Sequence, residues 1–227
     1  MARGAKRVER PMQPPLPPAE RTVGQLVAES IKLYGRNFLR ALPLGVVVAA
    51  VNQLTIDASR LVVGGVLLAG APIFSAAYAY ACQLEAERTP RRSWVIAIAA
   101  GSLVFVPAAL LFPWFALASV LWLGLVGLAV PAAMREGTSF TASLRRGFVL
   151  GRVDYVHAAG ALATLVILFF LMRIGLALLL ESQADNTVRT AVFLSDTILA
   201  PLLFLGGAIL YDDQRARLER PAEATPR

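Results

Sequence analysis

The stretch Val130–Arg152, VPAAMREGTSFTASLRRGFVLGR, decides how this chain is arranged. It is a short basic segment between two long apolar runs, of which one ends near Met134 and the other begins near Tyr155. An apolar run of about 20 residues can cross a bilayer as a helix, and loops rich in Lys and Arg stay on the cytoplasmic side. We therefore expect this segment to be a cytoplasmic loop between two membrane spans.

The composition is that of an integral membrane protein. Of the 227 residues, 57% are hydrophobic and 16% are charged, whereas soluble proteins have about 25% charged residues. The single Cys and the single His exclude a disulfide framework and a His-rich metal cluster. The sequence contains no P-loop, dinucleotide-binding, serine-hydrolase or zinc-protease motif, so we expect neither an enzyme nor a cofactor.

Six apolar segments predict an all-α protein with six transmembrane helices. The charge-free stretch 93–134 would form a helix of about 60 Å, twice the hydrocarbon thickness, so it must fold back. Phe112-Pro113-Trp114 is the expected turn. The predicted spans are residues 41–56, 61–83, 94–111, 115–134, 155–180 and 190–211. Prolines in four of them are expected to kink the helices: Pro72, Pro107, Pro131 and Pro201.

The remaining segments predict two surface helices and two tails around a membrane domain at 22–211. Residues 1–21 are basic and proline-rich, which predicts a disordered cytoplasmic tail, and 212–227 form a second tail. Segments 22–40 and 138–152 combine an apolar stripe with basic residues, which predicts two amphipathic cytoplasmic surface helices. A helix packed on protein is the alternative for the first, and charge that only sets topology is the alternative for the second. The residues expected to meet anionic lipid headgroups are Lys32, Arg36, Arg40, Arg145, Arg146 and Arg152.

The distribution of basic residues predicts the orientation of the chain. With the N-terminus inside, 19 of the 22 Lys and Arg residues lie in cytoplasmic segments, and Arg60, Arg173 and Arg189 do not. This is the positive-inside pattern, so both termini are expected in the cytoplasm. It also explains the net charge of +7 without nucleic acid. The expected partner is the lipid bilayer with its anionic lipids, and a protein partner or a second copy stays open.

Two charged side chains lie inside predicted spans, Arg173 in span five and Asp196 in span six. Both are about 10 Å below the outer helix ends. An unpaired charge at that depth costs about 2.5–3.5 kcal/mol, so we predict that these two side chains face each other. The pair either fixes helix packing or belongs to a ligand or ion site. Asn52 and Gln53 of span one lie at a similar depth and either join the pair in a polar cluster or hydrogen-bond across helices.

The central stretch and the chain's two ends resemble a known family. The matching residues are Pro131, Glu136, Gly137, Ser143, Leu144, Arg146 and Leu150, with Tyr211, Asp213 and Arg215 near the C-terminus. ESIKLYGRNFLR (29–40) is similar to the family's first helix. The chain thus resembles the membrane domain associated with bacterial glycerophosphoryl diester phosphodiesterases. The resemblance implies a six-helix domain of a bacterial cytoplasmic membrane, and the catalytic domain of some members has no counterpart here.

Three functions follow from these patterns. A non-enzymatic membrane component that scaffolds a partner or influences envelope lipids is the first hypothesis. The alternative is a small transporter or channel-like protein with a polar site between spans five and six. An accessory role in lipid phosphodiester metabolism is the weakest. A cavity that reaches Arg173 and Asp196 would favour transport, whereas a dry, tightly packed bundle would favour a scaffold.

Overall fold

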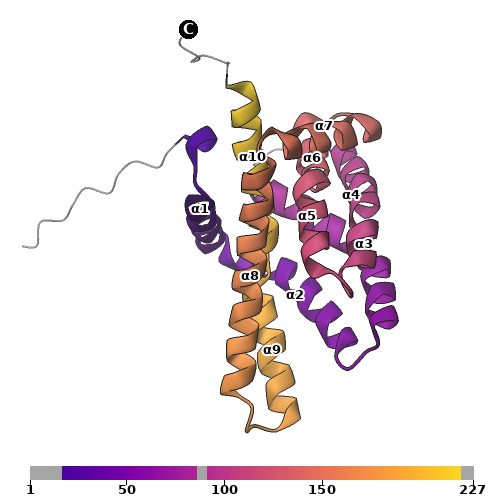
Figure 1. Cartoon of the computed structure of the whole chain (residues 1–227), viewed down its shortest axis with the longest axis vertical. Helices are drawn as coiled ribbons and strands as arrows, with labels where there is room; N and C mark the ends of the chain where they lie inside the picture. Colours follow the sequence, from indigo (N-terminus) through magenta and orange to yellow (C-terminus); the bar gives the residue numbers. More distant parts are fainter. Residues whose placement is uncertain (1–16, 86–90, 221–227) are drawn as a thin grey trace, which may run out of the picture.

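The computed structural model describes residues 17–85 and 91–220, and every regular element within them is a helix (Figure 1). A short 3-10 helix, η1 (Pro18–Glu20), precedes ten α-helices. Their bounds are α1 (Val23–Arg36), α2 (Phe38–Thr55), α3 (Arg60–Glu85), α4 (Arg91–Leu111), α5 (Ala116–Val126), α6 (Ala129–Glu136), α7 (Phe140–Val153), α8 (Tyr155–Leu179), α9 (Asp185–Leu199) and α10 (Pro201–Glu219).

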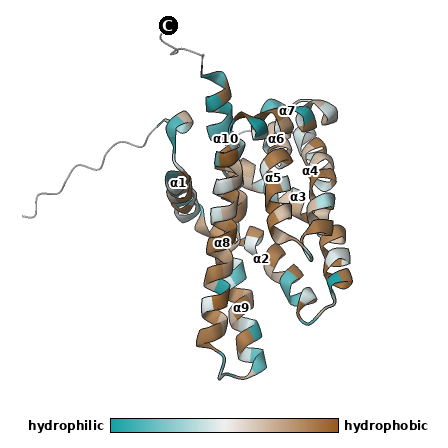
Figure 2. Cartoon of the chain, viewed as in Figure 1, coloured by the Kyte–Doolittle hydropathy of each residue, from teal (hydrophilic) through white to brown (hydrophobic). Residues whose placement is uncertain are grey.

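Six helical segments of the described chain are long and apolar enough to cross a membrane, which gives the fold of a multi-pass membrane protein. They are Phe38–Thr55, Arg60–Glu85, Ser93–Leu111, Ala116–Glu136, Tyr155–Leu179 and Asp185–Glu219. They follow the six predicted apolar segments in order. Polar residues gather where α7 and the end of α10 lie, at the top of Figure 2. We call this the α7 end of the bundle, and the α8–α9 loop marks the opposite end.

The expected turn between the third and fourth segments is present. Residues 112–114 form a turn between α4 and α5, and the amide of Trp114 donates to the carbonyl of Leu111 at 3.1 Å. Pro113 lies inside this turn, where its missing N–H and fixed φ break the helix. The long uncharged stretch therefore folds back on itself, as its length requires.

Two of the six candidate spans are interrupted rather than continuous. The fourth is divided into α5 and α6 by residues 127–128, and the sixth into α9 and α10 by Ala200. Proline has no N–H to donate, so Pro131 leaves the Gly127 carbonyl, and Pro201 the Thr197 carbonyl, without its usual helical partner. Pro72 and Pro107, in contrast, lie inside the unbroken helices α3 and α4.

Two glycines allow α7 to lie directly on α5 and α6. A Cβ on Gly147 would overlap the backbone of Ala129, and a Cβ on Gly151 would overlap the carbonyl of Leu125. Only residues without side chains permit such a close backbone approach in a helix pair. A helix is present where 138–152 was predicted to be one, as α7, and its inner face is fixed to the bundle.

The first surface helix differs from its prediction. Its capping box between Thr22 and Gln25 is present, but α1 ends at Arg36, so Arg40 belongs to the first span. Leu26 is completely buried, and Tyr34 nearly so, because this face of α1 packs against α8 and α10. Part of the apolar stripe of α1 thus meets protein, as the alternative interpretation expects, whereas Ile31 is 50% exposed.

The predicted tail boundaries also need correction. The last helix does not end at Tyr211 but continues to Glu219, because Asp213 and Gln214 are buried against neighbouring segments. At the other end of the chain, Arg21 forms an ion pair of 2.9 Å with Asp213, so residues 17–21 are packed on α10. Residues 1–16 and 221–227 of the predicted tails lie outside the described residues.

Candidate functional site

Three polar side chains meet inside the apolar part of the bundle. Arg173 of α8 places its Nε 3.4 Å from Oδ1 of Asp196 in α9. Asn52 of α2 donates a hydrogen bond of 2.7 Å from Nδ2 to the other carboxylate oxygen of Asp196. The Asp196 side chain is 1% exposed and that of Arg173 is 25% exposed. The structure therefore brings together three of the four intramembrane polar residues selected from the sequence.

Gln53, the fourth, does not join this group. Its side-chain amide donates to the backbone carbonyl of Arg189 at 2.9 Å, and the Arg189 guanidinium pairs with Asp57 at 3.1 Å. Consecutive helical residues point about 100° apart, so Asn52 and Gln53 cannot both face Asp196. Gln53 instead ties the end of α2 to the start of α9.

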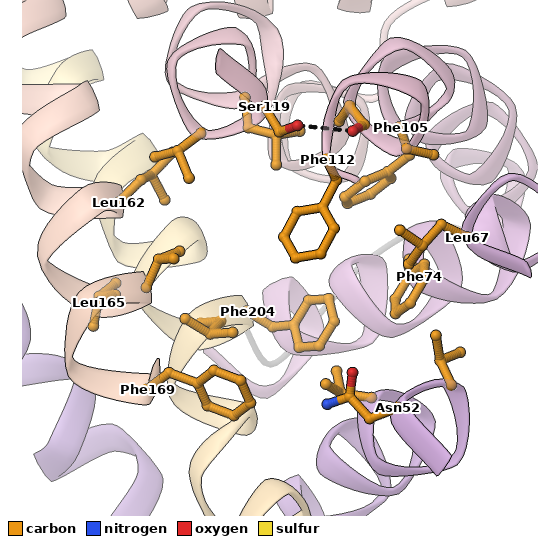
Figure 3. Close-up of a pocket in the computed structure, with 18 of the residues that line it drawn as sticks. Asn52, Leu67, Phe74, Phe105, Phe112, Ser119, Leu162, Leu165, Phe169 and Phe204 are labelled. Atoms are coloured by element: carbon orange, nitrogen blue, oxygen red, sulfur yellow. Dashed lines mark hydrogen bonds between the residues drawn. The ribbon is translucent and has the colours of Figure 1, made fainter. Parts of the chain in front are cut away.

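A cavity of about 480 Å³ lies beside the polar group, between α2, α3, α4, α5, α8 and α10 (Figure 3). Its lining is mostly apolar, with phenylalanines from several elements: Phe74, Phe105, Phe112, Phe169, Phe170 and Phe204. Small-molecule sites have volumes of about 300–1,000 Å³ and combine apolar walls with a few polar groups. This cavity has the size and the lining of such a site.

The lining of the cavity along α8 is about as long as one membrane leaflet is deep. Its lining on α8 extends from Leu162 to Arg173, which is about 16 Å at 1.5 Å per residue. The hydrocarbon core of a bilayer is about 30 Å thick, so each leaflet contributes roughly half of that. The cavity can therefore hold an apolar chain about as long as a leaflet is deep.

Polar groups are concentrated at one end of the cavity. Asn52 and Arg173 line it near the α8–α9 loop, and the Arg173 guanidinium also lies 6.0 Å from the Phe169 ring. Two lining hydroxyls already donate hydrogen bonds to backbone carbonyls. Ser119 donates to the carbonyl of Ala108 at 2.9 Å, and Thr55 donates to the carbonyl of Val51 at 3.0 Å. Tyr78 also lines the cavity, and its hydroxyl lies close to Gly207.

A second polar network lies at the α7 end and contains several residues of the family-like motif. Oε1 of Glu136 accepts hydrogen bonds from the Tyr211 hydroxyl at 2.7 Å and from Nε of Arg146 at 2.8 Å. Gly137 follows with φ of 61°, a left-handed conformation that favours glycine and ends α6. Glu136 therefore connects α6, α7 and α10.

The other motif residues have mixed environments. Ser143 is buried and its hydroxyl lies 2.9 Å from both the Thr138 hydroxyl and the Ser139 carbonyl. Leu150 is buried and Leu144 half-buried, whereas Arg215 forms an exposed pair with Glu219. Most of these motif residues therefore form contacts between helices and do not line an open site.

The α7 end also contains ion pairs that no motif indicated. Arg135 of α6 contacts Glu85 of α3 at 2.7 Å and Asp212 of α10 at 3.3 Å. Arg217 of α10 contacts Asp154, the residue before α8, at 2.7 Å. In the sequence, these ion pairs are indicated only by the accumulation of charges next to the predicted span ends. Which residues pair with each other follows only from the tertiary structure.

The residues predicted to meet lipid headgroups divide into two groups. Arg146 is directed into the protein by its bond to Glu136, and Lys32 contacts Glu29 at 2.7 Å. This ammonium lowers the pKa of the Glu29 carboxyl below its usual value. The others are exposed and form no ion pair within the described residues: Arg36, Arg40, Arg145 and Arg152.

No group of three or more His, Cys, Asp or Glu side chains is placed to hold a metal ion in the part of the chain that the structure describes. No family model matches the chain, and no curated protein or solved structure shows a match. The resemblance to the phosphodiesterase-associated membrane domain therefore stays a prediction, and function has to be argued from the cavity and its polar end.

Proposed function

We propose that the protein is a non-enzymatic membrane component that binds one lipid-like molecule in the cavity. The observation that carries this proposal is an apolar cavity of about 480 Å³, about one leaflet long, with Asn52 and Arg173 at one end. An amphipathic molecule has the same division, because its chain avoids water while its head group needs hydrogen-bonding partners. A bundle used only as a scaffold has no need of such a space.

The same proposal includes an orientation. We place the chain in a bacterial cytoplasmic membrane with six spans and both termini inside, supported by the 19 basic residues on that side. Arg173 then lies in the outer half of the bilayer, and the cavity extends from there across the midplane to Leu162. A bound lipid would have its head group toward the outer side and its chain toward the cytoplasmic side.

The exposed arginines of α7, together with Arg36 and Arg40, fit this orientation. Arg36, Arg40, Arg145 and Arg152 would face the cytoplasmic leaflet, whose anionic lipids attract such residues by about 1 kcal/mol each. Membership of the phosphodiesterase-associated membrane family would fit as well, because Glu136, Arg146 and Tyr211 of its motif form one contact. In this proposal the motif stabilises the helix arrangement around the cavity.

Transport of the bound molecule is the second candidate, and the interrupted helices favour it. Gly127 at the first break lines the cavity, as do Leu203 and Phe204 soon after the second. Helices broken near the membrane midplane are common in transporters, because they bend at such positions. Flux of a labelled amphipath across proteoliposomes would separate transport from simple binding.

The experiment that tests binding uses two neighbouring residues of α8. Val166 lines the cavity, whereas Ile167 is 57% exposed on the outer surface of the helix. We expect Val166→Trp to fill the cavity and to reduce the lipid that stays with the purified protein, measured by mass spectrometry. Ile167→Trp adds the same volume toward the bilayer and serves as the control. Equal lipid retention in both variants would contradict the proposal.

A further inference from the structure

We infer that the cavity selects a lipid-like molecule whose head group is uncharged and carries a hydroxyl, such as a long-chain alcohol or a monoacylglycerol. This inference rests on the proposed binding function and concerns its specificity. Two observations lead to it: the charge at the polar end is already balanced, and the free hydrogen-bonding atoms there include both donors and an acceptor.

The charge balance comes from Asp196. Its carboxylate lies 3.4 Å from Nε of Arg173 and is completely buried behind it. Asp196 does not itself line the cavity, so a ligand meets Arg173 and Asn52. An anionic head group would place a second negative charge beside this pair, in apolar surroundings where an unbalanced charge is costly. A neutral head group leaves the balance unchanged.

The hydrogen-bonding atoms give the second reason. A carboxylate accepts but does not donate, so the Asn52 amide must present its nitrogen to Asp196, as the 2.7 Å contact shows. The Asn52 oxygen is left as an acceptor, and in Figure 3 it is directed toward the interior of the cavity. Arg173 makes no hydrogen bond to other described residues, so its guanidinium donors are available.

A hydroxyl group matches this pair of residues and a phosphate or carboxylate does not. One hydroxyl can donate to the Asn52 oxygen and accept from Arg173 at the same time. A carboxylate, or an alkyl phosphate that has lost both protons, can only accept, so it would satisfy Arg173 while it faces the Asn52 oxygen without a proton between them. The polar end therefore discriminates by hydrogen bonding as well as by charge.

The test compares two head groups on one chain. The full protein is reconstituted in phosphatidylcholine nanodiscs and photolabelled with a diazirine analogue of decanol, and mass spectrometry locates the label. Decanol and decyl phosphate then compete at equal mole fractions in the bilayer. We expect label on cavity-lining peptides and decanol to compete at least about tenfold better than decyl phosphate.

Variants identify the source of the preference. Asp196→Asn leaves Arg173 without its counter-charge, so we expect the preference for decanol to fall at least about tenfold or to reverse. The double variant Arg173→Gln/Asp196→Asn removes both charges and should favour decanol again. Asp57→Asn is the matched control, since it removes the Arg189 partner at the same end of the bundle but does not line the cavity.

The outcomes separate the two claims. If the cavity is labelled but decyl phosphate competes as well as decanol, the inferred specificity is wrong and the binding function stands. An Asp196→Asn protein that keeps its full preference for decanol would also overturn the inference. If no lining peptide is labelled, the proposed binding function is wrong and the inference is overturned with it.

Discussion

The amide nitrogen of Asn52 lies 2.7 Å from a carboxylate oxygen of Asp196, although 144 positions separate the two residues in the chain. This hydrogen bond joins α2 to α9 next to the cavity. It also fixes the direction of the Asn52 oxygen, which the proposed ligand would use. The contact therefore connects the stability of the bundle with the chemistry of its candidate site.

Replacement of Asn52 should destabilise the protein. Asn52→Leu keeps a similar volume but leaves one oxygen of a completely buried carboxylate without its donor, which costs about 1–3 kcal/mol. We expect a lower thermal midpoint in detergent. Gln53→Leu is the control, because its bond goes to an exposed backbone carbonyl, and its effect should be smaller. Equal midpoints for the two variants would show that the Asn52 bond is unimportant.

The hydrogen bonds of Glu136 should contribute more to the free energy of unfolding than an exposed ion pair does. Glu136→Ala removes the partner of both Arg146 and Tyr211 at a partly buried site, and we expect a loss of about 1–3 kcal/mol in unfolding free energy. The matched control is Glu219→Ala, which breaks the exposed pair with Arg215 and should cost less than about 1 kcal/mol. Denaturation in mixed micelles measures both.

Gly45 should tolerate no side chain. A Cβ on this residue of α2 would overlap the Thr197 carbonyl, which lacks its usual donor because Pro201 occupies the next turn. Gly45→Ala should therefore separate α2 from α9 and lower the thermal midpoint. Gly65→Ala in α3 provides the comparison, since nothing lies within 4 Å of its added Cβ. That variant should be neutral or slightly stabilising.

Gly137 should be sensitive for a different reason. Its φ of 61° lies in the left-handed region, where an L-residue with a side chain costs about 1–2 kcal/mol. Gly137→Ala should destabilise by that amount, whereas Gly137→Asn should cost less, because asparagine tolerates this conformation better. Thermal unfolding of the two variants checks the order, and the opposite order would point to a steric cause instead.

The two exposed arginines of α7 should affect lipid preference without affecting stability. Arg145→Gln/Arg152→Gln removes two charges that would face anionic lipid, at about 1 kcal/mol each. We expect weaker retention of phosphatidylglycerol by the purified protein and an unchanged thermal midpoint. Arg146→Gln should lower the thermal midpoint and leave phosphatidylglycerol retention unchanged, because the Arg146 guanidinium is bound to Glu136. Phosphatidylglycerol retained equally in all three proteins would exclude lipid contact at α7.

The arrangement of the spans was predictable from sequence because it depends on local composition. The apolar runs and the turn at 112–114 correspond to the helices and the break between α4 and α5. That Arg173 and Asp196 lie at the same level was predictable in the same way, since each position follows from a count along one helix. That all six segments cross a membrane is a proposal that rests on their length and hydropathy, and the orientation is a proposal that rests on the charge distribution.

What depends on distant contacts was not predictable. The Asn52 bond to Asp196 requires the rotation of α2 against α9, which no local pattern gives. The cavity is a space between six helices, and its lining residues look like ordinary apolar residues in the sequence. The extension of α10 to Glu219 was hidden by polar residues such as Asp213 and Gln214, which suggest a tail until their buried neighbours are known.

The position of α1 has a consequence for how the chain is assembled. Its buried face, with Leu26 and Tyr34, packs on α8 and α10, and Arg21 just before it pairs with Asp213 of α10. The ribosome delivers both of these helices after α1. During synthesis the face of α1 that packs on α8 and α10 therefore stays uncovered until these helices have been made. Docking of α1 is then a late step of folding, and the bundle is more exposed to misassembly before that step.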